Sequence, residues 1–236
     1  MKRLLLTTLV IASFSGLANA SDGIYASVKS GISDTKVKSN SLDFYDPTLD
    51  LNGRFEFSNQ TKSVYPTISA AVGYDFSKIS NVNARAELEY TYKNSTSFNP
   101  QVVALVDLDT GERTTDGLES NSTNKLTTQS LMLNGYYDFK NQTKFTPYIS
   151  AGVGFTHVKN KQSDEDYSTS DSDNHFTWSA GVGVAYHISN NVALDASYRY
   201  VDAGKFKFTD TQDGEFARTN MKLSSNDYLL GIRYNF

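Results

Sequence analysis

Apolar and polar residues alternate with a period of two in eight segments of this chain. The segments cover residues 24–32, 66–76, 82–92, 131–139, 145–155, 178–188, 192–200 and 228–236. Every second residue of each segment gives 44 positions without one Asp, Glu, Lys or Arg, whereas the interleaved positions carry nine charged residues. This segregation predicts eight β-strands, each with one apolar and one polar face.

Aromatic residues gather at both ends of the apolar faces. Tyr74, Tyr137 and Tyr186 stand at one end, and Tyr90, Trp178 and Tyr198 at the other. An aliphatic band between two aromatic rows is typical of a barrel wall that faces lipid. A soluble barrel with an apolar interior is the alternative, but it gives no reason for two such rows.

Connections of two lengths join the segments. Those at 77–81, 140–144 and 189–191 are short, and those at 33–64, 94–125, 159–175 and 202–224 are long and polar. Short periplasmic turns and long outer loops are typical of outer-membrane barrels. The chain is therefore predicted to be all-β, an eight-stranded antiparallel transmembrane barrel with short periplasmic turns and four long extracellular loops.

The first 20 residues fit a secretory signal. A basic start, Met1-Lys2-Arg3, precedes a mostly apolar run too short to span a bilayer. Ala18 and Ala20 then form an A-x-A cleavage site. We expect a signal peptide over 1–20 that is removed on export, and a barrel domain over 21–236.

Composition excludes several classes of protein. The 236 residues include 22 Lys+Arg, 26 Asp+Glu and no Cys. Disulfides, thiol catalysis and Cys-ligated zinc are therefore excluded. The slightly acidic balance argues against nucleic-acid binding, which needs a basic stripe.

Several strand segments resemble the opacity (Opa) protein family: 84–90, 131–139, 144–149, 194–200 and 231–236. The resemblance covers the strands but not the loops. It implies an eight-stranded outer-membrane barrel, classed with opacity-type porins, whose variable loops bind host surface molecules. It also implies that the terminal residues Tyr234 and Phe236 form the signal read by the barrel-assembly machinery.

The resemblance also sets the expected location and partners. We expect the protein in the outer membrane, in contact with its lipid and lipopolysaccharide, with a host surface receptor as a further partner through the loops. The long connections, however, carry 19 acidic and 12 basic residues. Like charges repel, so a glycosaminoglycan, which basic loops of the family bind, fits these loops poorly.

Six charged residues lie on the predicted inner face: Arg85, Glu87, Glu89, Asp195, Arg199 and Arg233. We interpret them as a structural network of ion pairs, because eight strands leave room only for side chains. A pore filter or gated plug is the alternative.

Other candidate chemistry is sparse. His157, His175 and His187 are spaced by 18 and 12 residues, which fits no metal motif. Acidic clusters near Asp166 and Asp213 do not match a calcium-binding loop. No catalytic residue, metal or cofactor is therefore expected.

Three function classes remain. A surface barrel for interaction or adhesion is favoured, a small diffusion pore is the alternative, and an enzyme is the least favoured. An enzyme would need a positioned base with an acidic partner, and His175 with Asp171 or Asp173 is the candidate for it.

Overall fold

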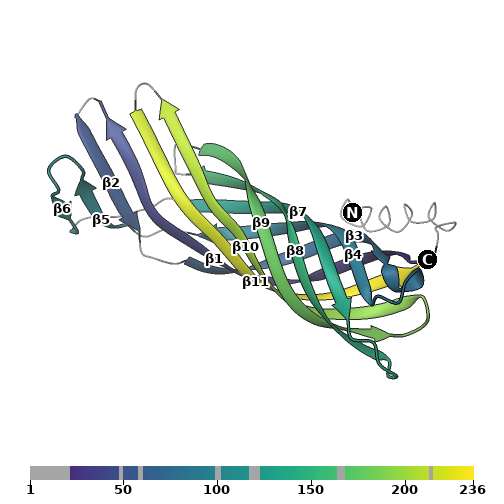
Figure 1. The fold of residues 1–236 in the computed structure, drawn as a ribbon. Helices are drawn as coiled ribbons and strands as arrows, with labels where there is room; N and C mark the ends of the chain where they lie inside the picture. The colour runs from purple at the N-terminus through teal and green to yellow at the C-terminus, as the bar shows by residue number, and fades with distance from the viewer. Residues whose placement is uncertain are drawn as a thin grey trace, which may run out of the picture.

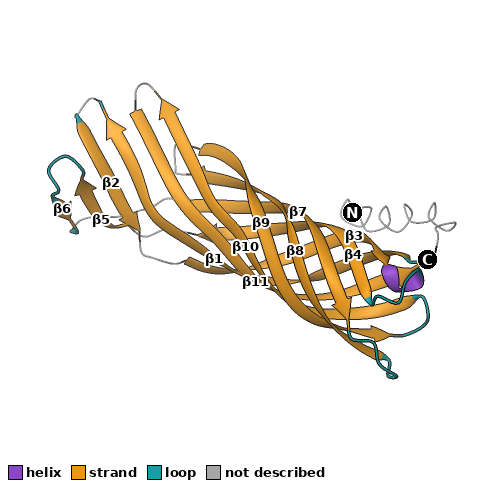
Figure 2. Cartoon of the chain, in the orientation of Figure 1, coloured by secondary structure: helices purple, strands orange, loops and turns teal. Residues whose placement is uncertain are grey.

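The computed structural model describes residues 22–47, 50–57, 61–98, 102–116, 123–163, 168–212 and 215–236. It contains a short 3-10 helix at Phe76–Lys78. Its strands are β1 (Ile24–Asp46), β2 (Leu51–Phe57), β3 (Thr61–Asp75), β4 (Ala84–Phe98), β5 (Val102–Asp107), β6 (Arg113–Thr114), β7 (Thr123–Asp138), β8 (Phe145–Ser163), β9 (Ser168–His187), β10 (Val192–Gln212) and β11 (Glu215–Asn235). Figure 2 shows how strands dominate this part of the chain. The predicted signal peptide with Ala18 and Ala20 lies outside the described residues.

Eight of the strands close into an antiparallel barrel. The order is β11-β10-β9-β8-β7-β4-β3-β1, and β1 pairs with β11 to complete the ring. The short turns and the C-terminus lie at one end, and the long hairpins rise from the other (Figure 1). The predicted all-β barrel of eight strands is confirmed.

The segments expected as long loops are largely strand, which corrects the sequence-based boundaries. Within 33–64, β1 continues to Asp46 and β2 follows. Within 202–224, β10 continues to Gln212 and β11 begins at Glu215. Once the chain leaves the lipid, the outward face turns polar, so the apolar alternation stops while backbone pairing continues.

Three short strands extend the sheet outside the barrel. β2 pairs with the end of β1, β5 with β2, and β6 with β5. β2 comes from the connection between β1 and β3, and β5 and β6 come from that between β4 and β7. The first two long connections are thus joined in one sheet beside the β10–β11 hairpin (Figure 1).

The two faces of the barrel wall differ sharply in burial. Leu230 and Val182 face outward and are 70 % and 54 % exposed, whereas Glu89 and Asp227 face inward and are fully buried. Apolar side chains at such exposure are stable in lipid but not in water. No helix in the described ranges is long and apolar enough to cross a membrane.

An apolar core fills the interior above the lipid-facing band. It consists of Val37, Leu126, Val158, Ala203, Phe206, Met221 and Leu223. A register shift between Asp202 and Gly204 changes the alternation of β10 and turns Phe206 inward. Gly204 has a φ of +82°, which glycine adopts without strain. These seven buried residues are called the apolar plug below.

Candidate functional site

The centre of the lumen holds a network of ion pairs between distant strands. Lys29 Nζ donates to Glu87 Oε1 at 2.6 Å and to Glu89 Oε2 at 2.7 Å. Arg199 Nη1 donates to the other oxygen of Glu89 at 2.6 Å. These residues lie on β1, β4 and β10, so the network ties opposite walls of the barrel together.

The network continues toward the extracellular side. Lys93 Nζ lies 2.8 Å and 2.9 Å from the two carboxylate oxygens of Asp227. Arg199 Nη2 donates to Asp227 at 3.4 Å, which joins this pair to the central one. Ser225 Oγ also donates to Asp227 at 2.8 Å. Asp227 thus receives three kinds of donor, as a buried carboxylate requires.

A second group of charges lies at the periplasmic end. Arg85 forms a two-pronged pair with Asp138, at 2.7 Å and 2.9 Å. Its guanidinium also stacks on the ring of Tyr136, 4.5 Å from the centroid. Arg233 lies 4.0 Å from Asp195 and is more loosely paired. Two of its nitrogens, Nε and Nη1, have no hydrogen-bond partner among the described residues.

The buried charges of the lumen balance. Among the described residues five are basic and five are acidic: Lys29, Lys93, Arg85, Arg199 and Arg233 against Glu87, Glu89, Asp138, Asp195 and Asp227. Burial of an unpaired charge costs several kcal/mol, so balance and close pairing allow this interior to fold.

All six charged residues predicted on the inner face are buried in the lumen, and the structure adds four more. Lys29 and Asp138 stand on the polar faces of their predicted segments and belong to the same set of buried charges. Lys93 and Asp227 lie just beyond the predicted strand ends. Continuing the alternation by one residue on β4 and on β11 places both on the inner face.

A layer of hydroxyl groups lies beside the Lys93–Asp227 pair, with Ser33 opposite Asp227 and Thr67 opposite Lys93. Thr156 Oγ1 lies 2.8 Å from Ser130 Oγ and 2.6 Å from Thr177 Oγ1. On the other side, Ser33 and Thr67 hydroxyls are 2.5 Å apart. A cavity beside Lys93 in this layer holds about 20 Å³, room for about one water molecule. In the described residues the lumen is therefore filled by charges, hydroxyls and the plug in turn.

The extracellular sheet has one aromatic face. Phe44 on β1 stacks on Phe55 on β2, with ring centroids 4.9 Å apart. Gly53 makes room for this contact, since a Cβ at that position would lie 2.4 Å from the Phe44 ring. Register places Leu105 of β5 opposite Phe55 and Leu42 of β1 on its other side. These half-buried side chains form an apolar strip across three strands.

The opposite face of this sheet carries paired charges. Arg54 donates to both oxygens of Asp43, at 2.5 Å and 3.1 Å, and these bonds raise the pKa of the Arg54 guanidinium. Arg113 on β6 donates to Glu56 on β2 at 2.8 Å. Apolar and charged residues therefore alternate here as they do in the barrel.

Two of the three histidines lie on the paired strands β8 and β9, where His175 is opposite Thr156, the neighbour of His157. His157 shares a hydrogen bond with Asn174 at 3.0 Å, and His187 shares one with Thr146 at 3.2 Å at the periplasmic end. His175 lies 3.9 Å from Asp173. In the described ranges no three His, Cys, Asp or Glu residues gather as a metal site would require. The acidic positions Asp166 and Asp213 lie outside those ranges.

The C-terminal residues complete the barrel seam. The Phe236 N–H donates to the Ile24 carbonyl at 3.0 Å. The rings of Tyr234 and Phe236 meet edge to face, with centroids 5.2 Å apart. Both therefore lie where the last strand meets the first.

A closed ring of strands with a lipid-facing wall and a charged lumen defines a transmembrane β-barrel. The family model described as "Outer membrane protein beta-barrel domain" matches residues 4–236. The chain belongs to this family, and it is an outer-membrane protein.

Relatives include opacity proteins, as the strand segments suggested. Outer membrane protein PagN of Salmonella typhimurium is 34 % identical, over 96 % of this chain and 95 % of its own length. Opacity protein opA58 of Neisseria gonorrhoeae is 28 % identical, over 75 % of this chain and 73 % of its own. A protein of Rickettsia conorii named "Putative adhesin" is 26 % identical over the whole of both chains.

Solved structures support the fold. The crystal structure of Neisserial surface protein A covers 91 % of this chain and 97 % of its own, with a TM-score of 0.51 and 20 % identity. At that identity the likeness concerns the barrel architecture alone.

Proposed function

We propose that this protein is a surface adhesin that binds a host surface molecule through its extracellular sheet. The main support for the proposal is the extracellular sheet of β1, β2, β5 and β6. In this sheet, strands from two long connections pair to form one ordered surface. The aromatic strip of Phe44 and Phe55 offers the kind of side chain that dominates binding energy in protein interfaces. The relative named "Putative adhesin" supports the same function.

The alternative functions have less support. A diffusion pore needs an open path, but Lys93, Asp227 and Phe206 occupy the lumen. An enzyme would rely on His175, whose Nε2 lies 3.9 Å from Asp173, too far for a hydrogen bond that orients a base. The proposed role is therefore binding without catalysis.

The test compares bacteria that display the intact barrel with bacteria that display a trimmed one. The trimmed variant replaces residues 40–60 and 99–122 by Asn-Gly turns, which removes β2, β5 and β6 but leaves the plug residues Val37 and Leu126. We expect binding to cultured host cells to fall to background. Equal binding by both would overturn the proposal.

Two further variants separate recognition from folding. Phe44→Ser with Phe55→Ser removes the aromatic strip while retaining the sheet's length, and we expect it to reduce binding at least about tenfold. The matched control deletes residues 164–167 between β8 and β9, two strands that do not pair with β1, β2 or β5. It should bind host cells as the intact protein does.

The lumen network and the terminal residues have structural roles in this proposal. The ion pairs of Glu89 and Arg199 fix the cross-section of the barrel and so hold the extracellular strands in place. Tyr234 and Phe236 present the assembly signal. Phe236→Ala should lower the amount of folded protein in the outer membrane without changing the binding per folded molecule.

A further inference from the structure

A row of lysines crosses three neighbouring strands on the outer face of the barrel. Lys38 on β1 lies opposite Lys222 on β11, and Lys205 on β10 lies opposite the same Lys222. All three side chains are exposed. Lys36 adds a fourth positive charge one row closer to the lipid. These four residues are called the lysine patch below.

The lysine patch is only partly neutralised by the protein. Lys222 Nζ lies 3.1 Å from Asp202, while no ion pair of Lys38 or Lys205 occurs among the described residues. In the described part of the chain, Asp34 lies two positions before Lys36 on β1. Like charges placed directly opposite each other destabilise a sheet. An anion outside the barrel would remove this cost.

An apolar groove lies on the same strands, within the lipid-facing band. Its volume is about 660 Å³, and its lining includes Ile32, Ala196, Tyr198, Tyr228 and Leu230. Register explains the hollow, because small side chains flank Leu230 on both sides: Ser30 on β1 and Ala196 on β10.

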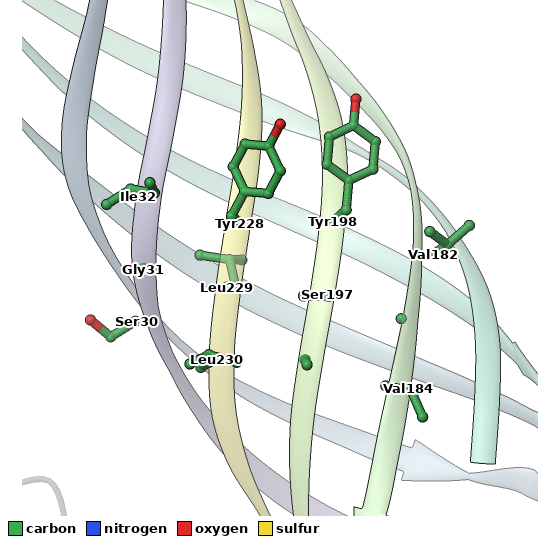
Figure 3. A pocket seen from close by; sticks show the side chains of 12 residues that line it. Ser30, Gly31, Ile32, Val182, Val184, Ser197, Tyr198, Tyr228, Leu229 and Leu230 are labelled. Carbon is green, nitrogen blue, oxygen red and sulfur yellow. The ribbon is translucent and has the colours of Figure 1, made fainter. Parts of the chain in front are cut away.

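The groove points toward the lysine patch. Figure 3 shows the rings of Tyr198 and Tyr228 side by side, with both hydroxyls directed away from Leu230. The Tyr198 hydroxyl donates to Asn226 Oδ1 at 2.8 Å, on the extracellular side. The tyrosines therefore mark the boundary between the apolar groove and the polar surface that carries the patch.

The distance between the lysine patch and the tyrosines indicates which kind of lipid could contact both the patch and the groove. Lys222 lies six residues from Tyr228 on β11. Six residues cover about 20 Å of strand, or about 15 Å along the membrane normal at a tilt of about 40°. The polar zone of a phospholipid leaflet is about 5–8 Å deep. A lipid that meets both features therefore needs phosphates carried on a large head group.

We propose that the outer face of β1, β11 and β10 binds one lipopolysaccharide molecule. An acyl chain lies in the groove against Ala196 and Leu230, and phosphates on the saccharide contact Lys38, Lys205 and Lys222. The site is separate from the proposed adhesive strip, since it uses the lipid-facing side of the barrel and the rim just above it.

The experiment measures binding to the folded protein in phosphatidylcholine nanodiscs by native mass spectrometry. Three probes are titrated: lipopolysaccharide, its deacylated saccharide and phosphatidylglycerol. We expect lipopolysaccharide to bind most tightly and at one molecule per barrel. If the deacylated saccharide or phosphatidylglycerol binds equally well, the combined site is wrong. A protein dimer in place of the lipid complex would also overturn it.

Variants of the patch and the groove complete the test. Lys38→Gln with Lys205→Gln and Lys222→Gln should weaken lipopolysaccharide binding at least about tenfold, because each basic residue near an anionic surface contributes a factor of about five. Ala196→Phe fills the groove and should weaken binding of lipopolysaccharide but not of the deacylated form. The matched control removes three periplasmic charges, Lys78, Lys140 and Lys144, and should bind normally. Unchanged binding by the triple patch variant would refute the proposal.

Discussion

Lys93 and Asp227 form a close ion pair across the lumen, with Nζ 2.8 Å from Oδ1. Their strands, β4 and β11, are separated in the wall by β3 and β1. The pair is therefore a contact across the interior and not between neighbouring strands. It also lies near the apolar plug, because the cavity of about 20 Å³ beside Lys93 is lined by Ala203 and Leu223 as well.

Replacing Lys93 by Met should destabilise the barrel by about 3 kcal/mol, since Asp227 then loses its closest basic partner and keeps the longer contact with Arg199 and the hydroxyl of Ser225. Urea titration of the protein in lipid vesicles would measure the change in the free energy of unfolding. Lys93→Met with Asp227→Asn should cost less than the two single changes together, because both charges are gone. Lys78→Met at the exposed end of the 3-10 helix is the control and should stay within about 0.5 kcal/mol. Additive costs would argue against the pair.

The filled lumen predicts an electrically silent protein. In planar bilayers we expect no lasting conductance steps. Phe206→Ala should be silent as well, because the charges around Glu89 and Asp227 still close the path below the plug. Conductance steps of constant size in the unaltered protein would support the pore function instead. Conductance steps in Phe206→Ala alone would show that the plug is the only barrier to ions.

The free-energy cost of a charged residue on the outer wall should depend on its depth in the bilayer. Val182 lies midway between the aromatic ends of β9, at Trp178 and Tyr186, and is 54 % exposed. Val182→Lys should cost about 2–4 kcal/mol, the range found at the bilayer midplane. Phe176→Lys lies beyond Trp178 and should cost about 0–1 kcal/mol. The amount of folded barrel recovered in lipid vesicles checks both, and equal recovery would mean that this face does not meet lipid.

The sequence was sufficient for the barrel because lipid imposes a strict rule on every second residue. Leu230 and Ile232 had to face outward once Gly231 and Arg233 faced inward. The same rule fails above the membrane. There, residues on both faces of β1 beyond Val37 are polar or mixed, so the alternation gives no boundary and predicts loops where the structure has paired strands.

The added sheet and the lysine patch needed coordinates for a different reason. Phe55 meets Leu105 from another long connection, and the patch joins Lys38 to Lys222 across 184 positions of the chain. Neither contact leaves a local pattern in the sequence. A bulge at Ala203 also reverses the alternation of β10. Phe206 therefore faces inward, although the alternation of the residues before the bulge predicts that it faces outward.

The turn between β5 and β6 lies outside the membrane, and its stability should depend on pH. Asp107 accepts backbone hydrogen bonds from Asp109 and Thr110, at 2.8 Å and 3.0 Å, and these bonds lower the pKa of its carboxyl group. Because the pKa of Asp107 is lowered on folding, its carboxylate stabilises the turn fully at pH values above the ordinary pKa of about 3.9. This stabilisation is lost as the pH falls through the lowered pKa of the folded protein. In an NMR titration, the amide of Thr110 should therefore shift with a midpoint below about 3.9. Asp107→Ala should abolish this shift and increase hydrogen exchange at Thr110, whereas Asp109→Asn should retain it. A midpoint at or above the ordinary value would show that the carboxylate does not hold the turn.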